Sequence, residues 1–340
     1  MLPLLERWAC GPAIRASMAT SGRNEAKSEV TSGGPGHTLW IAVRLLTRTL
    51  LVLAVAVVIA TPTARSASAS ERSLTILVLA GQSNALGYSS YVVDPKTHKD
   101  VFSGRANAAA DKHVLLMWTE TGVTSSGASP VPLDTLQVLS GAPSAVFGPE
   151  VGLGRKLYSL GHHNLLIVKV AFSGSSLAVS WQPTAPDFQA MLSRVVQATS
   201  WAKQHGWHPV IGGFYWFQGE TDAMNATMSA AYSQNLEGLL SNVRTTLKIP
   251  ATTPIVIGQT DIADFIRYEE LNGLCTTPSC DGEWTWNHEV MEAQAAADAR
   301  HVYVASTASL PRYEDFIHLT NDAELSLGEK FAELSSKHLG

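Results

Sequence analysis

Cysteine is scarce in this sequence: 3 cysteines occur among 340 residues, which excludes a scaffold held together by disulfide bonds. The chain has no Cys-x-x-Cys pair, so a zinc ribbon is also excluded. Charged residues make up only 16% of the chain, and the formal net charge is −5. Because nucleic-acid binding needs a concentrated basic face, we expect no nucleic-acid partner.

Several common catalytic and cofactor motifs are also missing. Ser83 is not surrounded by Gly-x-Ser-x-Gly, which argues against the nucleophile elbow of ordinary α/β-hydrolases. The glycine-rich stretch at 148–154 does not follow a buried strand, as a dinucleotide fingerprint requires. The pair His162–His163 lacks further ligands at metal spacing, and His288–Glu289 lacks the second histidine of a zinc protease. We therefore predict neither a cofactor nor a metal.

The N-terminal segment, residues 1–72, is predicted to precede the folded domain as a disordered extension followed by a targeting sequence. Arg44 and Arg48 come before an unbroken apolar run from Leu50 to Ala60, and small residues follow at 64–69. A positive flank, a short apolar core and an A-x-A-like exit form the pattern of a secretory signal. The apolar run is about half of the ~20 residues that a membrane-spanning helix needs.

We accordingly predict cleavage near Ala67 or Ala69 and a secreted or extracytoplasmic protein. The alternative is a retained membrane anchor over residues 40–60, through which alone the chain would meet a membrane. In an exported protein, Cys275 and Cys280 are close enough in sequence to form a disulfide bond. Two free thiols in a loop are the open alternative.

From residue 73 to residue 340 the chain alternates between short apolar runs and helix-like stretches. Near-continuous apolar runs are typical of strands that are buried on both faces of a parallel sheet. The predicted strands are Leu74–Ala80, Leu165–Ala171, Val210–Phe217, Pro254–Gly258 and Val302–Ala305. The predicted helices are Pro149–Leu160, Phe188–His205, Met228–Leu247, His288–Arg300 and Asn321–His338. This alternation predicts one three-layer α/β/α domain around a five-stranded parallel sheet.

One long segment interrupts this alternation. Residues 88–146 are rich in Ser, Gly and Pro, and we interpret them as an insertion after the first strand. Loops of that length in compact domains tend to form lids or the walls of binding sites.

Polar residues follow the end of every predicted strand but the last, and another polar block precedes the final helix. Ligands bind outside the carboxyl ends of the strands in an open parallel sheet, so these residues are candidates for a site. The blocks are Gly81-Gln82-Ser83-Asn84, Ser173-Gly174-Ser175-Ser176, Gln218-Gly219-Glu220-Thr221-Asp222, Gln259-Thr260-Asp261 and Asp315-Phe316-Ile317-His318. A serine, a histidine and several carboxylates at one edge of a sheet favour nucleophilic acyl transfer.

Three of these residues form a candidate catalytic triad. A serine hydroxyl becomes a good nucleophile when a histidine takes its proton, and a carboxylate must fix the tautomer of that histidine. We assign Ser83 as nucleophile, His318 as base and Asp315 as the carboxylate, since a spacing of three residues places Asp315 near the imidazole. Glu220 is the competing acid, although we favour a structural role for it.

The remaining candidates surround this triad. The backbone amides of Ser83 and Gly174 and the side-chain amide of Gln218 are predicted to form the oxyanion hole. Gln82 and Asn84 are predicted to support the triad or to line the substrate pocket. Three aromatic residues belong either to the core or to a wall that stacks against sugar, and the core is favoured for the last two: Trp181, Tyr215 and Trp216.

Taken in order, these motifs resemble the SGNH hydrolase superfamily, and within it the sialate O-acetylesterase and acetylxylan esterase branch. The resemblance covers the chain from about Leu74 to its end. It implies a flavodoxin-like α/β/α fold, no metal, and the removal of acetyl groups from sugar hydroxyls. It also implies that Ser83 is the nucleophile, that Asp315 and His318 complete the triad, and that a glycine and an amide side chain line the oxyanion hole. Gln218 stands where the wider superfamily has asparagine. The sialate branch resembles this sequence in having glutamine at that place.

The function predicted from the sequence is therefore that of a serine esterase. It would hydrolyse O-acetyl esters on carbohydrates through an acetyl-enzyme intermediate, with an acetylated carbohydrate as its partner. Two alternatives stay open: an SGNH esterase, lipase or thioesterase for non-carbohydrate acyl esters, and a catalytically inactive carbohydrate-binding protein.

Overall fold

The computed structural model describes residues 72–88, 108–120, 126–134, 147–262, 284–313 and 315–339. All of them belong to one compact unit that begins at residue 64. The predicted N-terminal segment up to residue 71, much of the predicted insertion, and Cys275 and Cys280 lie outside the described residues. Within the described part of the chain, no helix is both long and apolar enough to span a membrane.

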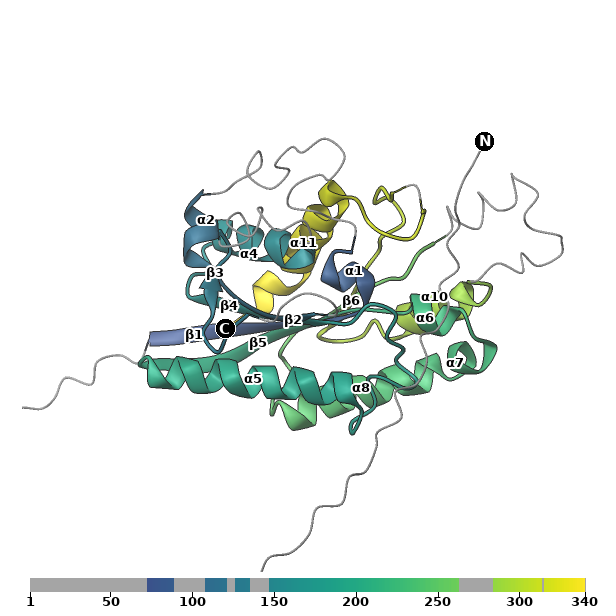
Figure 1. The fold of residues 1–340 in the computed structure, drawn as a ribbon, viewed down its shortest axis with the longest axis horizontal. Coiled ribbons are helices and arrows are strands. Elements are labelled where there is room, and N and C mark those ends of the chain that lie inside the picture. Colours follow the sequence, from purple (N-terminus) through teal and green to yellow (C-terminus); the bar gives the residue numbers. More distant parts are fainter. Residues whose placement is uncertain are drawn as a thin grey trace, which may run out of the picture. The chain divides into compact units, whose positions relative to one another are not determined.

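A sheet of seven strands forms the centre of the domain, in the order β3-β2-β4-β1-β5-β6-β7 (Figure 1). The strands are β1 (Arg72–Gly81), β2 (Leu115–Glu120), β3 (Val131–Pro132), β4 (Leu165–Ala171), β5 (Trp207–Phe217), β6 (Ile255–Gly258) and β7 (Val302–Ala305). Every neighbouring pair is parallel except β2 and β3. The five predicted strands are β1, β4, β5, β6 and β7, and their spatial order is that of flavodoxin-like folds.

The predicted count of five strands was wrong, because the supposed insertion contributes to the sheet. Residues Leu115–Glu120 pair in parallel with β4, and the two-residue strand β3 pairs with them in turn. The apolar side chains of Leu116 and Met117 are buried, so β2 is part of the core. Helix α2 (Ala108–His113) also lies in the segment interpreted from the sequence as an insertion.

Helices cover both faces of the sheet, as the three-layer prediction requires (Figure 1). On one face lie α4 (Pro149–Ser159) and α11 (Asn321–Ser335), and on the other lie α5 (Pro186–Gln204) and α8 (Tyr232–Thr246). The remaining helices are α1 (Ser83–Leu86), α6 (Glu220–Ala223), α7 (Ala226–Ala230), α10 (Asn287–Ala296) and a terminal 3₁₀ turn at Ser336–His338. The single helix predicted at 228–247 is thus divided into α7 and α8. Gly161 and Gly206 follow α4 and α5 with φ of +91° and +74°, which confirms both glycine stop signals.

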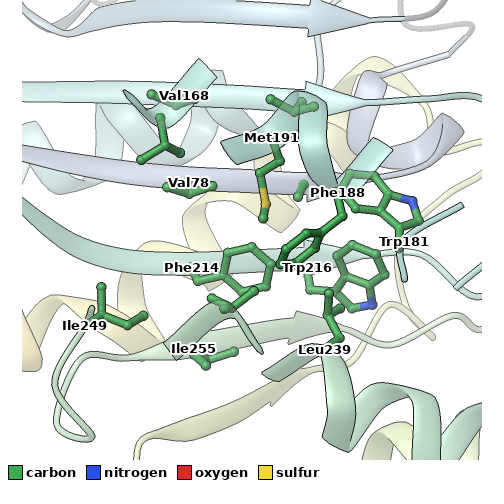
Figure 2. Packing of buried hydrophobic residues seen from close by; sticks show 14 of the residues in the cluster. Val78, Val168, Trp181, Phe188, Met191, Phe214, Trp216, Leu239, Ile249 and Ile255 are labelled. Atoms are coloured by element: carbon green, nitrogen blue, oxygen red, sulfur yellow. The ribbon is translucent and has the colours of Figure 1, made fainter. Parts of the chain in front are cut away.

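Large aromatic side chains fill the layer between the sheet and α5 (Figure 2). The ring of Trp181 meets that of Trp216 edge to face, with centroids 5.0 Å apart, in the geometry that aromatic pairs prefer. Tyr215 lies in the core on the opposite face of the sheet. All three side chains are at most 1% exposed, so the core role predicted for Tyr215 and Trp216 is confirmed and extends to Trp181.

Candidate active site

The strand order reverses direction between β1 and β5, and the loops after these two strands open the candidate site. In sheets of this kind such a switch point is where ligands bind. Ser83 follows β1 as the first residue of α1, and Gln218 and Glu220 follow β5, with Glu220 at the start of α6. The two strands approach so closely that a Cβ atom on Gly81 would lie 2.0 Å from the backbone oxygen of Phe217. Glycine is therefore required directly before the Gln82–Ser83 turn.

Asp315 and His318 lie in direct contact in the loop before α11. His318 Nδ1 donates a hydrogen bond to Asp315 Oδ2 over 2.7 Å. The other carboxylate oxygen, Oδ1, accepts the backbone N–H groups of Ile317 and His318 at 3.0 and 2.9 Å. Because the proton is held on Nδ1, the Nε2 atom of His318 keeps its lone pair and is the acceptor that a general base needs.

The charge of Asp315 is stabilised by these contacts. Burial acts to raise the pKa of the carboxyl, but the hydrogen bonds from the His318 ring and from two backbone amides outweigh it and hold the pKa below its usual value. The carboxylate therefore stays ionised throughout the neutral range.

Asn84 connects residues 315–319, here called the histidine loop, to the helix that begins with Ser83. Its side-chain Nδ2 donates to the backbone oxygen of Ile317 over 3.2 Å, and its Oδ1 accepts the backbone N–H of Leu319 over 3.0 Å. The same Nδ2 donates to Glu220 Oε1 over 2.6 Å. Residues from three distant parts of the sequence, around positions 84, 220 and 318, thus meet at one end of the sheet.

The Ser83 hydroxyl and the His318 ring lie on neighbouring segments, but within the described residues no hydrogen bond joins them. The ring of Tyr88 lies 4.6 Å from that of His318 between centroids, and the Tyr88 backbone N–H donates to the backbone oxygen of Ser83 over 2.9 Å. Catalytic hydrogen bonds are often long in the absence of substrate and tighten in the complex. The structure therefore brings the three predicted triad residues to one place, while their catalytic roles stay predictions.

Gly174 lies in the loop after β4, beside the end of β1. The backbone N–H of Phe172 donates to the backbone oxygen of Gly81 over 3.0 Å, which ties this loop to the strand that precedes Ser83. Gly174 has φ of +72°, a conformation that favours glycine. In the described part of the chain, the backbone N–H groups of Ser83 and Gly174 meet no backbone acceptor, and their role in the oxyanion hole stays a prediction.

Gln218 differs from our expectation, because its side chain faces the interior. Its Nε2 lies within hydrogen-bonding distance of three acceptors, and the side chain is fully buried. These acceptors are Gln82 Oε1 at 3.0 Å, the Ser175 backbone oxygen at 3.1 Å and Asp222 Oδ2 at 2.6 Å. An amide nitrogen has only two hydrogens, so none is left for an oxyanion. The predicted role of Gln218 in the oxyanion hole is not supported by this geometry.

The side chains of Gln82 and Asp222 accept backbone N–H groups from the loops around the site. Gln82 Oε1 accepts the backbone N–H groups of Gly219 and Thr221, both at 3.3 Å, in addition to the Gln218 amide. Gln82 thus supports the loop after β5, as one of its two predicted roles requires. Asp222 accepts the backbone N–H groups of Leu177 and Ala178 at 2.8 and 3.0 Å. No role was predicted for Asp222 from the sequence, where its place two residues after Glu220 was the available signal.

Glu220 does not occupy the place of the triad acid. Within the described residues no hydrogen bond joins it to His318; its Oε1 accepts the Asn84 amide, and its Oε2 has no hydrogen-bond partner there. Burial raises the pKa of Glu220, and the hydrogen bonds from its own backbone and from Asn84 offset that rise only in part. The structural role expected for Glu220 fits this position.

The described residues contain no group of three or more His, Cys, Asp or Glu side chains that could hold a metal ion. The chemistry offered by the groups named above is that of a hydroxyl, an imidazole, a carboxylate and two backbone donors. These groups suit acyl transfer by covalent catalysis.

Comparison with known proteins identifies the family. A protein-family model described as carbohydrate esterase, sialic acid-specific acetylesterase, matches residues 73–337. A probable carbohydrate esterase from Arabidopsis thaliana is 23% identical over 265 residues, which cover 76% of this chain and 88% of the relative.

Two solved structures share the fold. The X-ray structure of the protein from the same Arabidopsis thaliana locus matches with a TM-score of 0.55 and 18% identity, over 78% of this chain and 99% of that one. The crystal structure of NanS matches with a TM-score of 0.50 and 16% identity, over 78% and 97%. Because the family match spans most of the chain, the protein belongs to the carbohydrate esterase family of sialic acid-specific acetylesterases.

Proposed function

We propose that the protein is a serine esterase that hydrolyses O-acetyl esters on carbohydrates through an acetyl-enzyme intermediate. The observation that carries the proposal is the 2.7 Å contact between His318 Nδ1 and Asp315, in a loop that Asn84 bonds to the helix of Ser83. Membership of the carbohydrate esterase family supports the substrate class.

The proposed reaction has two halves. Ser83 Oγ attacks the acetyl carbonyl while His318 Nε2 takes the hydroxyl proton, and the oxyanion is held by the N–H groups of Ser83 and Gly174. The tetrahedral intermediate expels the sugar oxygen, which receives the proton from the imidazolium, and leaves acetylated Ser83. A water molecule then attacks the acetyl-enzyme while His318 Nε2 takes its proton. The imidazolium returns that proton to Ser83 Oγ as the bond to the acetyl group breaks, and acetate leaves.

Acetate release from a panel of acetylated sialic acid, acetylated xylan and p-nitrophenyl acetate tests this function. We expect Ser83→Ala to lower kcat by on the order of 10⁶, the loss seen when one member of a triad is removed. Ser335→Ala is a matched control, because Ser335 is a buried serine of α11 whose hydroxyl contacts Tyr215. Wild-type turnover by the Ser83→Ala variant would show that Ser83 is not the nucleophile.

The same panel separates the two alternatives. Faster hydrolysis of p-nitrophenyl octanoate than of the acetate, with no acetate released from glycans, would favour an esterase for other acyl groups. Failure of a fluorophosphonate probe to label Ser83, together with glycan binding, would favour an inactive carbohydrate-binding protein.

We also propose that the protein is exported and that residues 1–72 contain its signal. The proposal is supported by the arginines, the apolar run and the small residues at 64–69. The mass of the protein recovered outside the cytoplasm tests it: cleavage after residue 67 or 69 is expected, whereas an intact N-terminus in the membrane fraction would favour the anchor.

A further inference from the structure

The side chain of Asn84 uses both hydrogens of its amide and its oxygen. Nδ2 donates one hydrogen to the backbone oxygen of Ile317 and the other to Glu220 Oε1, and Oδ1 accepts the Leu319 N–H. The residue is 2% exposed. Because these groups are engaged and buried, Asn84 is not part of the pocket surface.

The two backbone groups that Asn84 holds belong to the residues on either side of His318. An amide that donates to residue 317 and accepts from residue 319 makes the same pair of bonds that a neighbouring strand makes in a sheet. Two bonds of opposite sense fix both the distance and the rotation of the loop, whereas one bond would leave a hinge. The residue that follows the nucleophile in sequence therefore sets the position of the base.

The histidine loop needs such an external support. Phe316 has φ of +58°, a left-handed conformation that is strained for residues with a side chain and persists only when surroundings impose it. Asp315 supports the loop from within, through two backbone N–H groups and the imidazole. Asn84 supports it from the helix that carries Ser83, so Asn84 couples the two halves of the triad.

Glu220 supports one orientation of the Asn84 amide. Its Oε1 accepts from the nitrogen side of the amide at 2.6 Å, the same orientation that the Ile317 oxygen and the Leu319 N–H require. With the nitrogen on that side, the oxygen of Asn84 faces Leu319, as the loop requires. Glu220 is buried at the start of α6, so its Oε1 is a fixed acceptor that reinforces this orientation.

We propose that Asn84 is a positioning residue that sets the register of His318 against Ser83, and that Glu220, by accepting from the same amide nitrogen, holds that side chain in place. Neither side chain touches the substrate. The proposal rests on the proposed function, because it assigns a role within the same triad.

The decisive variant is Asn84→Asp, which keeps the shape of the side chain. It removes both donated hydrogen bonds and places a carboxylate against Glu220. We expect kcat on p-nitrophenyl acetate to fall by about 10²-fold, the loss that follows a displacement of about 1 Å in a reacting group. KM should change less than about threefold, since substrate contacts are not altered.

A second substitution tests the partnership between the two residues. Glu220→Gln supplies an amide that can donate to the carboxylate introduced at position 84, so Asn84→Asp combined with Glu220→Gln should recover at least about tenfold of the lost kcat. Glu220→Gln alone should lower kcat much less than Asn84→Asp, because its amide oxygen can still accept from Asn84. A double-mutant cycle measures this coupling directly.

A matched control separates a positioning role of Asn84 from a merely structural one. Asp111 is buried and binds Arg155 through two bonds of 2.8 Å that join α2 to α4. Asp111→Asn should lower the unfolding temperature without changing kcat, whereas Asn84→Asp should lower kcat at temperatures where it remains folded. If Asn84→Asp does not fold, Asn84→Ala replaces it with the same expected loss of kcat.

A kcat within about twofold of wild type in a folded Asn84→Asp or Asn84→Ala protein would overturn the proposal. So would an equal loss of kcat in Asn84→Asp and in the double variant. These failures are distinct from failure of the proposed function, which Ser83→Ala tests: an inactive Ser83→Ala with a fully active Asn84→Ala would retain the esterase and reject only the positioning role.

Discussion

The side-chain ammonium group of Lys169 donates a hydrogen bond to the backbone oxygen of Leu86 over 2.7 Å. A buried charge on the interior strand β4 thus holds the last residue of the helix that begins with Ser83. Lys169 also pairs with Glu120 at 2.7 Å and with Glu150 at 3.0 Å. Burial acts to lower the pKa of Lys169, but the two carboxylates outweigh it and raise the pKa, so the group is charged.

Loss of the Lys169 charge should destabilise the fold strongly. Lys169→Met leaves Glu120 and Glu150 buried without their cation, and we expect the free energy of unfolding in urea to fall by about 3–5 kcal/mol. Lys156→Met is the control, because Lys156 pairs with the exposed Glu333 on the surface and surface ion pairs contribute little. Equal losses in the two variants would contradict a special role for the buried charge.

Gly152 allows the backbones of α4 and α11 to touch. A Cβ atom at this position would lie 2.0 Å from the backbone oxygen of Leu325. Gly152→Ala must therefore separate the two helices, and we expect a loss of roughly 3 kcal/mol in unfolding free energy, at the upper end of overpacking effects. Urea denaturation measures this loss, and a stabilising Gly152→Ala would show that α4 and α11 do not pack this closely.

Gly238 provides the opposite case. It lies within α8, and among the described residues no neighbouring atom comes within 4 Å of the place where a Cβ atom would stand. Gly238→Ala should raise the unfolding free energy by about 0.4–1 kcal/mol, because alanine has less backbone freedom to lose on folding. The same urea titration measures the gain, and a loss of stability would contradict the open space at this position.

Glu324 should make stability decline with rising pH. It is fully buried on α11, and neither carboxylate oxygen has a hydrogen-bond partner within the described residues. Burial, and then the like charge of Glu150, raises its pKa well above the ordinary value of 4.5. The folded state therefore keeps a proton that the unfolded state has already released.

The direction of the pH dependence of stability follows from that difference in bound protons between the folded and the unfolded state. Between the ordinary pKa of 4.5 and the raised pKa, the Glu324 contribution to the unfolding free energy should fall by about 1.4 kcal/mol per pH unit. Glu324→Gln removes this contribution, so its stability relative to wild type should rise as the pH is raised above the ordinary carboxyl pKa of 4.5. Glu329→Gln, an exposed position on the same helix, should follow wild type. A parallel pH dependence of Glu324→Gln and wild type would contradict a protonated Glu324.

Asp315→Asn should abolish most activity while it retains the loop. The amide oxygen can still accept the backbone N–H groups of Ile317 and His318, but the amide nitrogen then faces Nδ1 and donates to it. The imidazole proton must move to Nε2, which can no longer act as base, and a loss of about 10⁴ in kcat is expected. Asp298→Asn, an exposed aspartate, is the control. A normal kcat in the Asp315 variant would show that another residue supplies the carboxylate of the triad.

The strands and most helices could be predicted because their signals are local. The runs at β4 and β7 are apolar over their whole length apart from Lys169, and glycines stand close after α4 and α5. The contact of Asp315 with His318 could be predicted for the same reason, since the two residues are three positions apart on one turn. Strand β2 was missed because its short run lies in a Ser-, Gly- and Pro-rich segment and gains its burial only by pairing with β4.

The sequence by itself determined which polar residues stand at the strand ends, because parallel strands bring their carboxyl ends to the same edge. Only the tertiary structure decided which partner each of them takes. Gln218 carries the right donor for an oxyanion, yet Asp222, Gln82 and Ser175 surround it and direct its hydrogens inward. Asn84, chosen from its place beside Ser83, meets the flanks of His318 across 235 positions of sequence. A hydrogen bond forms or fails over a few tenths of an ångström, and distances of that size between remote segments exist only in the folded chain.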